Sequence, residues 1–141
     1  VSIYTAALDI IRHYWVTGIG IGAFNQIYPL FSFEAANAYH AHNLFLQEFI
    51  ELGIVGFAVL LLLLLFFFQR LYSGMRTAPK RFRFLLGAIF GGFAGLLLQG
   101  LTDHLWFDYR IVLFFWCFIG IGMATVRVAE KKGERETEEM K

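Results

Sequence analysis

Apolar residues in the second half of the chain gather in three long runs instead of alternating with polar ones. The runs cover about residues 52–71, 84–101 and 111–126, and the block 60–68 contains no polar side-chain atom. A transmembrane helix needs about 20 mostly apolar residues, so each run predicts one membrane-spanning helix. A buried helix of a water-soluble protein is the alternative for a single run, but three runs that lack a polar face argue against it.

The segment 1–51 carries a different pattern, which begins with an amphipathic helix. Between Ile3 and Tyr14, apolar residues recur at three- and four-residue spacing, and polar residues fill the other face. We expect this helix to lie on the bilayer surface or on neighbouring spans. Arg12 on its polar face could instead meet an anionic ligand, but Asp9, three residues earlier, can neutralise it.

Lys and Arg residues differ in density between the segments that separate the runs. They gather in 70–83 and 127–141, whereas 1–51 holds only Arg12 and the 102–110 loop holds only Arg110. Because short cytoplasmic loops carry an excess of Lys and Arg, we predict a cytoplasmic C-terminus and an N-terminal segment outside, in a periplasm or at a cell surface. Residues 127–141 are predicted to form a cytoplasmic polar tail, of which we expect Glu130–Lys141 to remain solvated and mobile.

Composition agrees with this architecture and excludes other classes of protein. Of 141 residues, 58% are hydrophobic and 16% are charged, whereas about 25% are charged in typical soluble domains. The single cysteine, Cys117, excludes a disulfide scaffold. A net charge of +1 with segregated basic residues argues against nucleic-acid binding. The predicted fold is an all-α, polytopic integral membrane protein with three transmembrane helices, preceded by a mostly helical extracytoplasmic segment.

Glycines recur in two places. Gly18, Gly20 and Gly22 alternate after the first helix, a spacing that suits either a tight turn packed on a helix or a loop that cradles a phosphate. The Lys-Ser/Thr pair and the preceding strand of a phosphate loop are missing, so we favour the turn. In the second run, glycines recur every four residues, which predicts close packing of another helix.

A polar stripe leads into the first run. Asn43, Gln47 and Glu51 are spaced by four residues and share one helix face, and His40 and His42 lie just upstream. A continuous helix of about 31 residues would be about 46 Å long, longer than the roughly 30 Å hydrocarbon core. His42 and Asn43 are therefore expected at its outer end, where either residue could cap the helix. A His-x-His metal site lacks an obvious third ligand, so we expect no metal.

Polar residues also collect at the outer ends of the other two runs. Gln99, Asp103 and His104 close the second run, and Asp108 and Arg110 open the third. Ionisable residues at membrane depth indicate a functional site by default. The alternative is ordinary anchoring at the membrane interface.

Three motifs resemble the C-terminal part of the O-antigen ligase and O-antigen polymerase superfamily. The first is Ile3-Tyr4 with a helix leading to the glycine segment 17–24. The second is the segment 40–47, His-Ala-His-Asn-Leu-Phe-Leu-Gln, which runs into Glu-Leu-Gly-Ile-Val-Gly at 51–56. The third and weaker one is Gly-Leu-Thr-Asp at 100–103. The resemblance covers nearly the whole chain except the tail.

The resemblance implies metal-independent, inverting glycosyl transfer at the outer face of a bacterial cytoplasmic membrane. The implied donor is a glycan on a polyprenyl diphosphate, and the acceptor is a lipid, a protein or another glycan. The family's loop histidine falls on His42, and its implied role is to orient or deprotonate the acceptor hydroxyl, which suits an imidazole. No cofactor is expected. The residues expected to bind substrate are Asn43, Gln47, Gly20, Gly22 and Asp103.

The chain also departs from the family's pattern. The family's loop arginine would fall just before Val1, and Arg12 does not replace it. We therefore expect the chain to be the C-terminal part of a longer protein and to be inactive alone. Two other functions stay open: a transporter or channel subunit, suggested by Gln99 and the glycine-rich second run, and a non-catalytic assembly protein in which His42 and Asn43 are replaceable.

Overall fold

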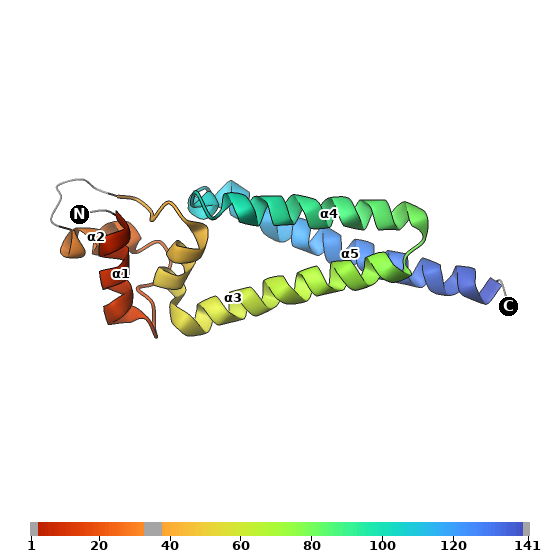
Figure 1. The fold of residues 1–141 in the computed structure, drawn as a ribbon, viewed down its shortest axis with the longest axis horizontal. Coiled ribbons are helices and arrows are strands. Elements are labelled where there is room, and N and C mark those ends of the chain that lie inside the picture. The colour runs from red at the N-terminus through yellow and green to blue at the C-terminus, as the bar shows by residue number, and fades with distance from the viewer. Residues whose placement is uncertain (1–2, 33–37, 140–141) are drawn as a thin grey trace. The chain divides into compact units, whose positions relative to one another are not determined.

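The structure is a computed structural model, and it describes residues 3–32 and 38–139. Within these ranges all regular secondary structure is helical, which confirms the all-α prediction (Figure 1). The elements are α1 (Ile3–Tyr14), α2 (Phe24–Phe31), α3 (Leu44–Thr77), α4 (Lys80–Gln99), the short 3-10 helix η1 (Leu105–Phe107) and α5 (Tyr109–Glu139).

Three of these helices are long and apolar enough to cross a membrane. They are α3, α4 and the Tyr109–Glu136 part of α5, so the prediction of three candidate spans is confirmed. Large apolar side chains on them lie exposed, as a lipid-facing surface requires; examples are Val59, Leu62, Leu65, Phe66 and Phe114.

The chain divides into two compact units, one formed by residues 1–62 and 98–108 and the other by 63–97 and 109–141. In the first unit, α1 packs on α2. The apolar face that the sequence predicts for α1 buries Ala6 and Ile10, and α2 contributes the buried rings of Phe24 and Tyr28. The amphipathic helix thus covers its apolar face with protein.

A break at Gly53 divides α3, where the sequence predicts one continuous helix. Gly53 has φ 66° and ψ −178°, a conformation that only glycine adopts at low cost. The N–H of Ile54 donates to the carbonyl of Trp15 at 2.7 Å, and the carbonyl of Ile50 accepts from the N–H of Ile19 at 3.0 Å. The loop after α1 therefore satisfies the backbone groups that the break frees.

In the second unit, aromatic rings of α3, α4 and α5 contact one another. Phe67 of α3 lies 4.8 Å from Phe93 of α4, and Phe93 lies 5.2 Å from Phe115 of α5, measured between ring centroids. Helix α5 approaches α3 closely at Gly122, where a Cβ atom would lie 2.8 Å from the Phe67 ring. The regularly spaced glycines of α4 do not make such an approach: Gly91 and Gly95 have no described neighbour within 4 Å of that position, and at Gly87 the nearest atom is the Met75 sulfur at 3.7 Å.

The C-terminal tail is helical in the structure, since α5 continues through it as far as Glu139. Arg70 of α3 donates two hydrogen bonds to the carboxylate of Glu130, at 2.9 and 3.0 Å. Both bonds come from one nitrogen, Nη2, and this ion pair connects α3 to the first part of the tail. The tail is also rich in Glu, Lys and Arg, which favour helix.

Candidate functional site

Asn43 fixes the start of α3 and ties it to a distant loop. Its side-chain oxygen accepts the N–H of Leu46 at 2.9 Å, as an N-cap residue does. Its amide nitrogen donates to the carbonyl of Leu101 at 2.9 Å, and the N–H of Leu44 donates to the carbonyl of Gly100 at 2.7 Å. These bonds bring the loop after α4 next to the first residues of α3.

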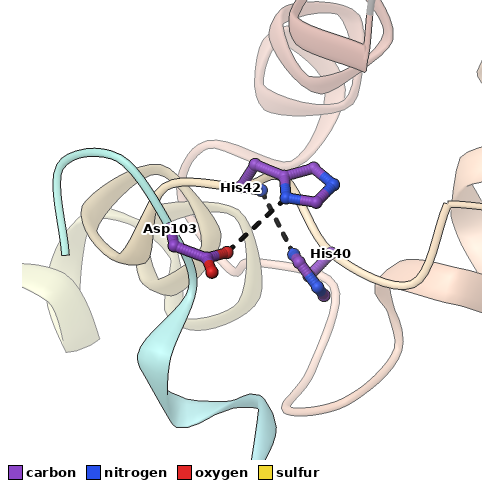
Figure 2. A group of neighbouring side chains, drawn as sticks. All are labelled: His40, His42 and Asp103. Carbon is purple, nitrogen blue, oxygen red and sulfur yellow. Dashed lines mark hydrogen bonds and ion pairs between the residues drawn. The ribbon is translucent and has the colours of Figure 1, made fainter. Parts of the chain in front are cut away.

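Asp103 of that loop faces His42, as Figure 2 shows. The Nδ1 atom of His42 lies 3.5 Å from the Oδ1 atom of Asp103, and both side chains are about half exposed. His42 has φ 50°, a left-handed conformation that histidine tolerates better than most residues. Its N–H donates to the Nδ1 atom of His40 at 3.3 Å, and the two imidazole rings lie 4.3 Å apart.

The surroundings of this pair favour the ionised form of the Asp103 carboxyl and the neutral forms of the His40 and His104 imidazoles. The hydrogen bond from the backbone N–H of His104, followed by the neighbouring histidines, lowers the pKa of Asp103. Burial lowers the pKa of His40, and burial lowers the pKa of His104 to about 4. At neutral pH, the charge that His42 faces most closely is therefore the negative charge of Asp103.

His40, His42 and Asp103 also form a set of side chains that could converge on a cation, since one donor atom from each lies within 4.8 Å of the others. Asp103 is the third potential ligand that the sequence did not show. The Nδ1 atom of His40 accepts a backbone N–H, and the Nδ1 atom of His42 faces the Asp103 carboxylate. A cation bound through these two Nδ1 atoms would compete with both contacts.

The glycine loop (residues 18–22) is held against α3 by Glu51. The N–H of Gly20 donates to the backbone carbonyl of Glu51 at 3.0 Å, and the N–H of Gly22 donates to its carboxylate at 2.8 Å. A Cβ atom at Gly18 would overlap the carbonyl of Glu51. The N–H groups of Gly20 and Gly22 are thus engaged within the protein, which gives the phosphate-cradle alternative no support and matches the turn that the sequence favours.

Gln47 lies behind the histidine loop (residues 39–43) and is only 2% exposed. Its side-chain oxygen accepts the N–H of Ala41 at 2.8 Å, and its amide nitrogen donates to Glu51 at 2.6 Å. The predicted polar stripe therefore exists, but Gln47 and Glu51 point into the protein. Both ends of the Gln47 amide are used there, so its place differs from that of a residue that contacts a substrate directly.

The structure therefore links all six residues that the sequence singles out, at different depths. His42, Asp103, Gly20 and Gly22 are exposed, Asn43 is half-buried between His42 and Leu101, and Gln47 is buried. Arg12 stays apart from this group, because it donates to Asp9 at 2.9 Å as the sequence suggests.

The fold also brings aromatic residues without a predicted site role beside His40. The ring of Phe107, from η1, lies 5.1 Å from the ring of His40, and the ring of Tyr39 lies 6.4 Å from that of Phe107. The sequence indicates Glu51 only as part of the polar stripe. Pairing between residues far apart in the chain has no periodic signal, so only the aromatic and acidic residue types could have suggested these neighbours.

Comparison with known proteins identifies one related family. Residues 1–61 match the family model described as O-Antigen ligase. The matched segment contains α1, the glycine loop, α2, the histidine loop and the break in α3. The match confirms the family resemblance over the first two motifs, and the third motif, at 100–103, lies outside the matched residues. No curated protein and no solved structure matches the chain.

Proposed function

We propose, from the membership of residues 1–61 in the O-antigen ligase family, that this chain is the acceptor-activating part of a membrane glycosyltransferase. The observation that carries the proposal is the pairing of His42 with Asp103 at the exposed end of the first candidate span. The donor is a glycan on a polyprenyl diphosphate in the outer leaflet of a bacterial cytoplasmic membrane. The acceptor is a hydroxyl group of a lipid, a protein or a second glycan.

In this proposal, His42 acts as the general base. When the Nδ1 atom of His42 carries its proton and faces the Asp103 carboxylate, the Nε2 atom has a free lone pair. That atom accepts the proton of the acceptor hydroxyl while the hydroxyl oxygen attacks the anomeric carbon of the donor. The bond from that carbon to the diphosphate oxygen breaks, and the lipid diphosphate leaves. Asp103 orients the imidazole and stabilises the imidazolium that forms.

The leaving diphosphate requires cationic partners, because its charge grows as the bond breaks. Within the described part of the first unit, Arg12 is already paired with Asp9. We therefore place the diphosphate against basic groups other than Arg12. Asn43, which lies between His42 and the loop after α4, is placed to align the two halves of the site.

The proposal is tested by His42→Ala in the full-length protein expressed in its host. We expect glycan transfer to fall at least a hundredfold, since general base catalysis contributes about 10²–10⁴-fold. Membrane insertion should stay normal, because His42 is half exposed. Transfer is measured by gel analysis of the acceptor and by turnover with purified lipid-linked donor.

His13→Ala is the matched control, because His13 is an exposed histidine of α1 whose ring hydrogen-bonds the carbonyl of Asp9 and lies 5.3 Å from the ring of Phe31, away from His42. We expect it to transfer glycan at the wild-type rate. Wild-type product from His42→Ala would contradict the assigned role and favour an assembly protein in which the histidine is replaceable.

A further inference from the structure

We propose that the buried pair formed by Gln47 and Glu51 is the positioning element of the site, which holds the glycine loop and the histidine loop in fixed places on α3. The inference rests on the proposed function for its catalytic consequence, and on the hydrogen bonds alone for its structural one. Gln47 is 2% exposed and Glu51 is 7% exposed. Neither side chain is open to a substrate, so both act through the groups that they hold.

The hydrogen bonds of the pair run in one unbroken line from loop to loop. The N–H of Ala41 donates to the side-chain oxygen of Gln47, and the Gln47 amide nitrogen donates to one carboxylate oxygen of Glu51. The other carboxylate oxygen accepts the N–H of Gly22. Ala41 directly precedes His42, so this line fixes the backbone from which the imidazole projects.

The polarity of this line is specified at every link. Glu51 must offer two acceptors, because both of its partners are N–H donors, and Gln47 must offer one donor and one acceptor. A buried link that opposes two donors or two acceptors leaves polar groups unsatisfied, which is costly. The chain thus tolerates an exchange of the two residue types but not either single change.

The backbone around the pair leaves little room for adjustment. The N–H of Gly20 bonds the Glu51 carbonyl, and a Cβ atom at Gly18 would overlap that carbonyl. On the other side, Ala41 is fully buried and His42 has a left-handed backbone. A shift of Glu51 therefore moves both loops, and a displacement of about 1 Å at a catalytic group can cost about a hundredfold in rate.

The experiment compares four full-length proteins: wild type, Glu51→Gln, Gln47→Glu and the double exchange. Glu51→Gln turns an NH₂ group toward an N–H donor, and Gln47→Glu sets two carboxylates face to face. In the double exchange, the carboxylate at position 47 accepts from Ala41 and from the new amide, whose oxygen accepts from Gly22. We expect each single change to lower kcat about ten- to a hundredfold with little change in the KM for donor, and the double exchange to restore kcat.

A second readout measures the loops without relying on catalysis. Ile21 and Tyr39 are 84% and 65% exposed, one in each loop, and both can carry a spin label in a background in which Cys117 is replaced by serine. We expect a narrow distance distribution in wild type and in the double exchange, and a broad one in each single variant.

Glu48→Gln is the matched control, because Glu48 has the same exposure as Glu51, 7%, and lies on the same part of α3. Neither loop bonds to it in the described part of the chain. It makes the same Glu-to-Gln exchange at a buried position without changing any hydrogen bond of the line, so kcat and the distance distribution should match wild type.

The outcomes separate this inference from the proposed function. Single variants that keep narrow distances, or a double exchange no better than the single changes, would overturn the inference. Single variants with broad distances but wild-type transfer would overturn the positioning role. Distances that follow the expected pattern in a protein that transfers no glycan, wild type included, would support the structural role of the pair and overturn the proposed function.

Discussion

His42 is placed by three local features that act on one residue. Its left-handed backbone turns the chain sharply, its N–H is bonded to the ring of His40, and its own ring faces Asp103. The first two features set where the imidazole projects, and the third sets which nitrogen carries the proton. A base prepared in this way needs little reorganisation when the acceptor arrives.

The role of Asp103 follows at the same scale. Asp103→Asn keeps the shape of the side chain and removes its negative charge, so the imidazolium of His42 loses its stabilising partner. We expect glycan transfer to fall about tenfold or more with unchanged membrane insertion. Turnover with purified donor measures the change.

Asp9→Asn is the comparison for this prediction, because the carboxylate of Asp9 pairs with Arg12 of the same helix. A wild-type rate in Asp103→Asn, or an equal loss in both variants, would contradict a specific orienting role for Asp103.

At the scale of the element, the break in α3 decides where the site lies. The break frees backbone groups at residues 50–54, and the loop after α1 occupies them. The short part of α3 before the break then holds Gln47 and Glu51 against this loop. His42 lies two residues before the first residue of α3, Leu44. A straight helix would pair the same backbone groups internally and leave the glycine loop without partners.

Gly53→Ala tests the break. A Cβ atom there would overlap the carbonyl of Val16, and the backbone has positive φ, which costs about 1–3 kcal/mol for a residue other than glycine. We expect the free energy of unfolding to fall by at least this amount, measured by thermal or denaturant unfolding in detergent.

Gly120→Ala is the matched control, because Gly120 is inside α5 and no residue that the structure describes lies within 4 Å of its Cβ position. Alanine there should raise stability by about 0.5–1 kcal/mol, as in an ordinary helix interior. Equal effects of the two substitutions would mean that the break is not specified by Gly53.

At the scale of the whole molecule, the distribution of Lys and Arg predicts the orientation. With Cys117 replaced by serine, single cysteines are introduced by His40→Cys and Lys80→Cys, and intact cells are treated with a membrane-impermeant maleimide. We expect labelling at position 40 in intact cells and labelling at position 80 only after permeabilisation, because basic loops stay in the cytoplasm. Labelling of both positions from the same side would contradict the three-span topology.

The sequence by itself determined the class of the protein, because long apolar runs, glycine spacing and the His-Asn segment are local patterns that need no partner to be read. The runs predicted the three helices, and the four-residue spacing of Asn43, Gln47 and Glu51 placed them on one face. Asn43 as a helix cap was among the alternatives for the same reason, since capping is decided within four residues.

Only the tertiary structure decided what that face does. The partners of Gln47 and Glu51 are backbone N–H groups of two separate loops, and Asp103 reaches His42 across about 60 residues of chain. Such pairings leave no periodic trace in a sequence, because they depend on how the chain returns to itself. The break at Gly53 is similar: a glycine in an apolar run is compatible with a continuous helix, and only the loop that bonds the freed backbone groups makes the broken form the stable one.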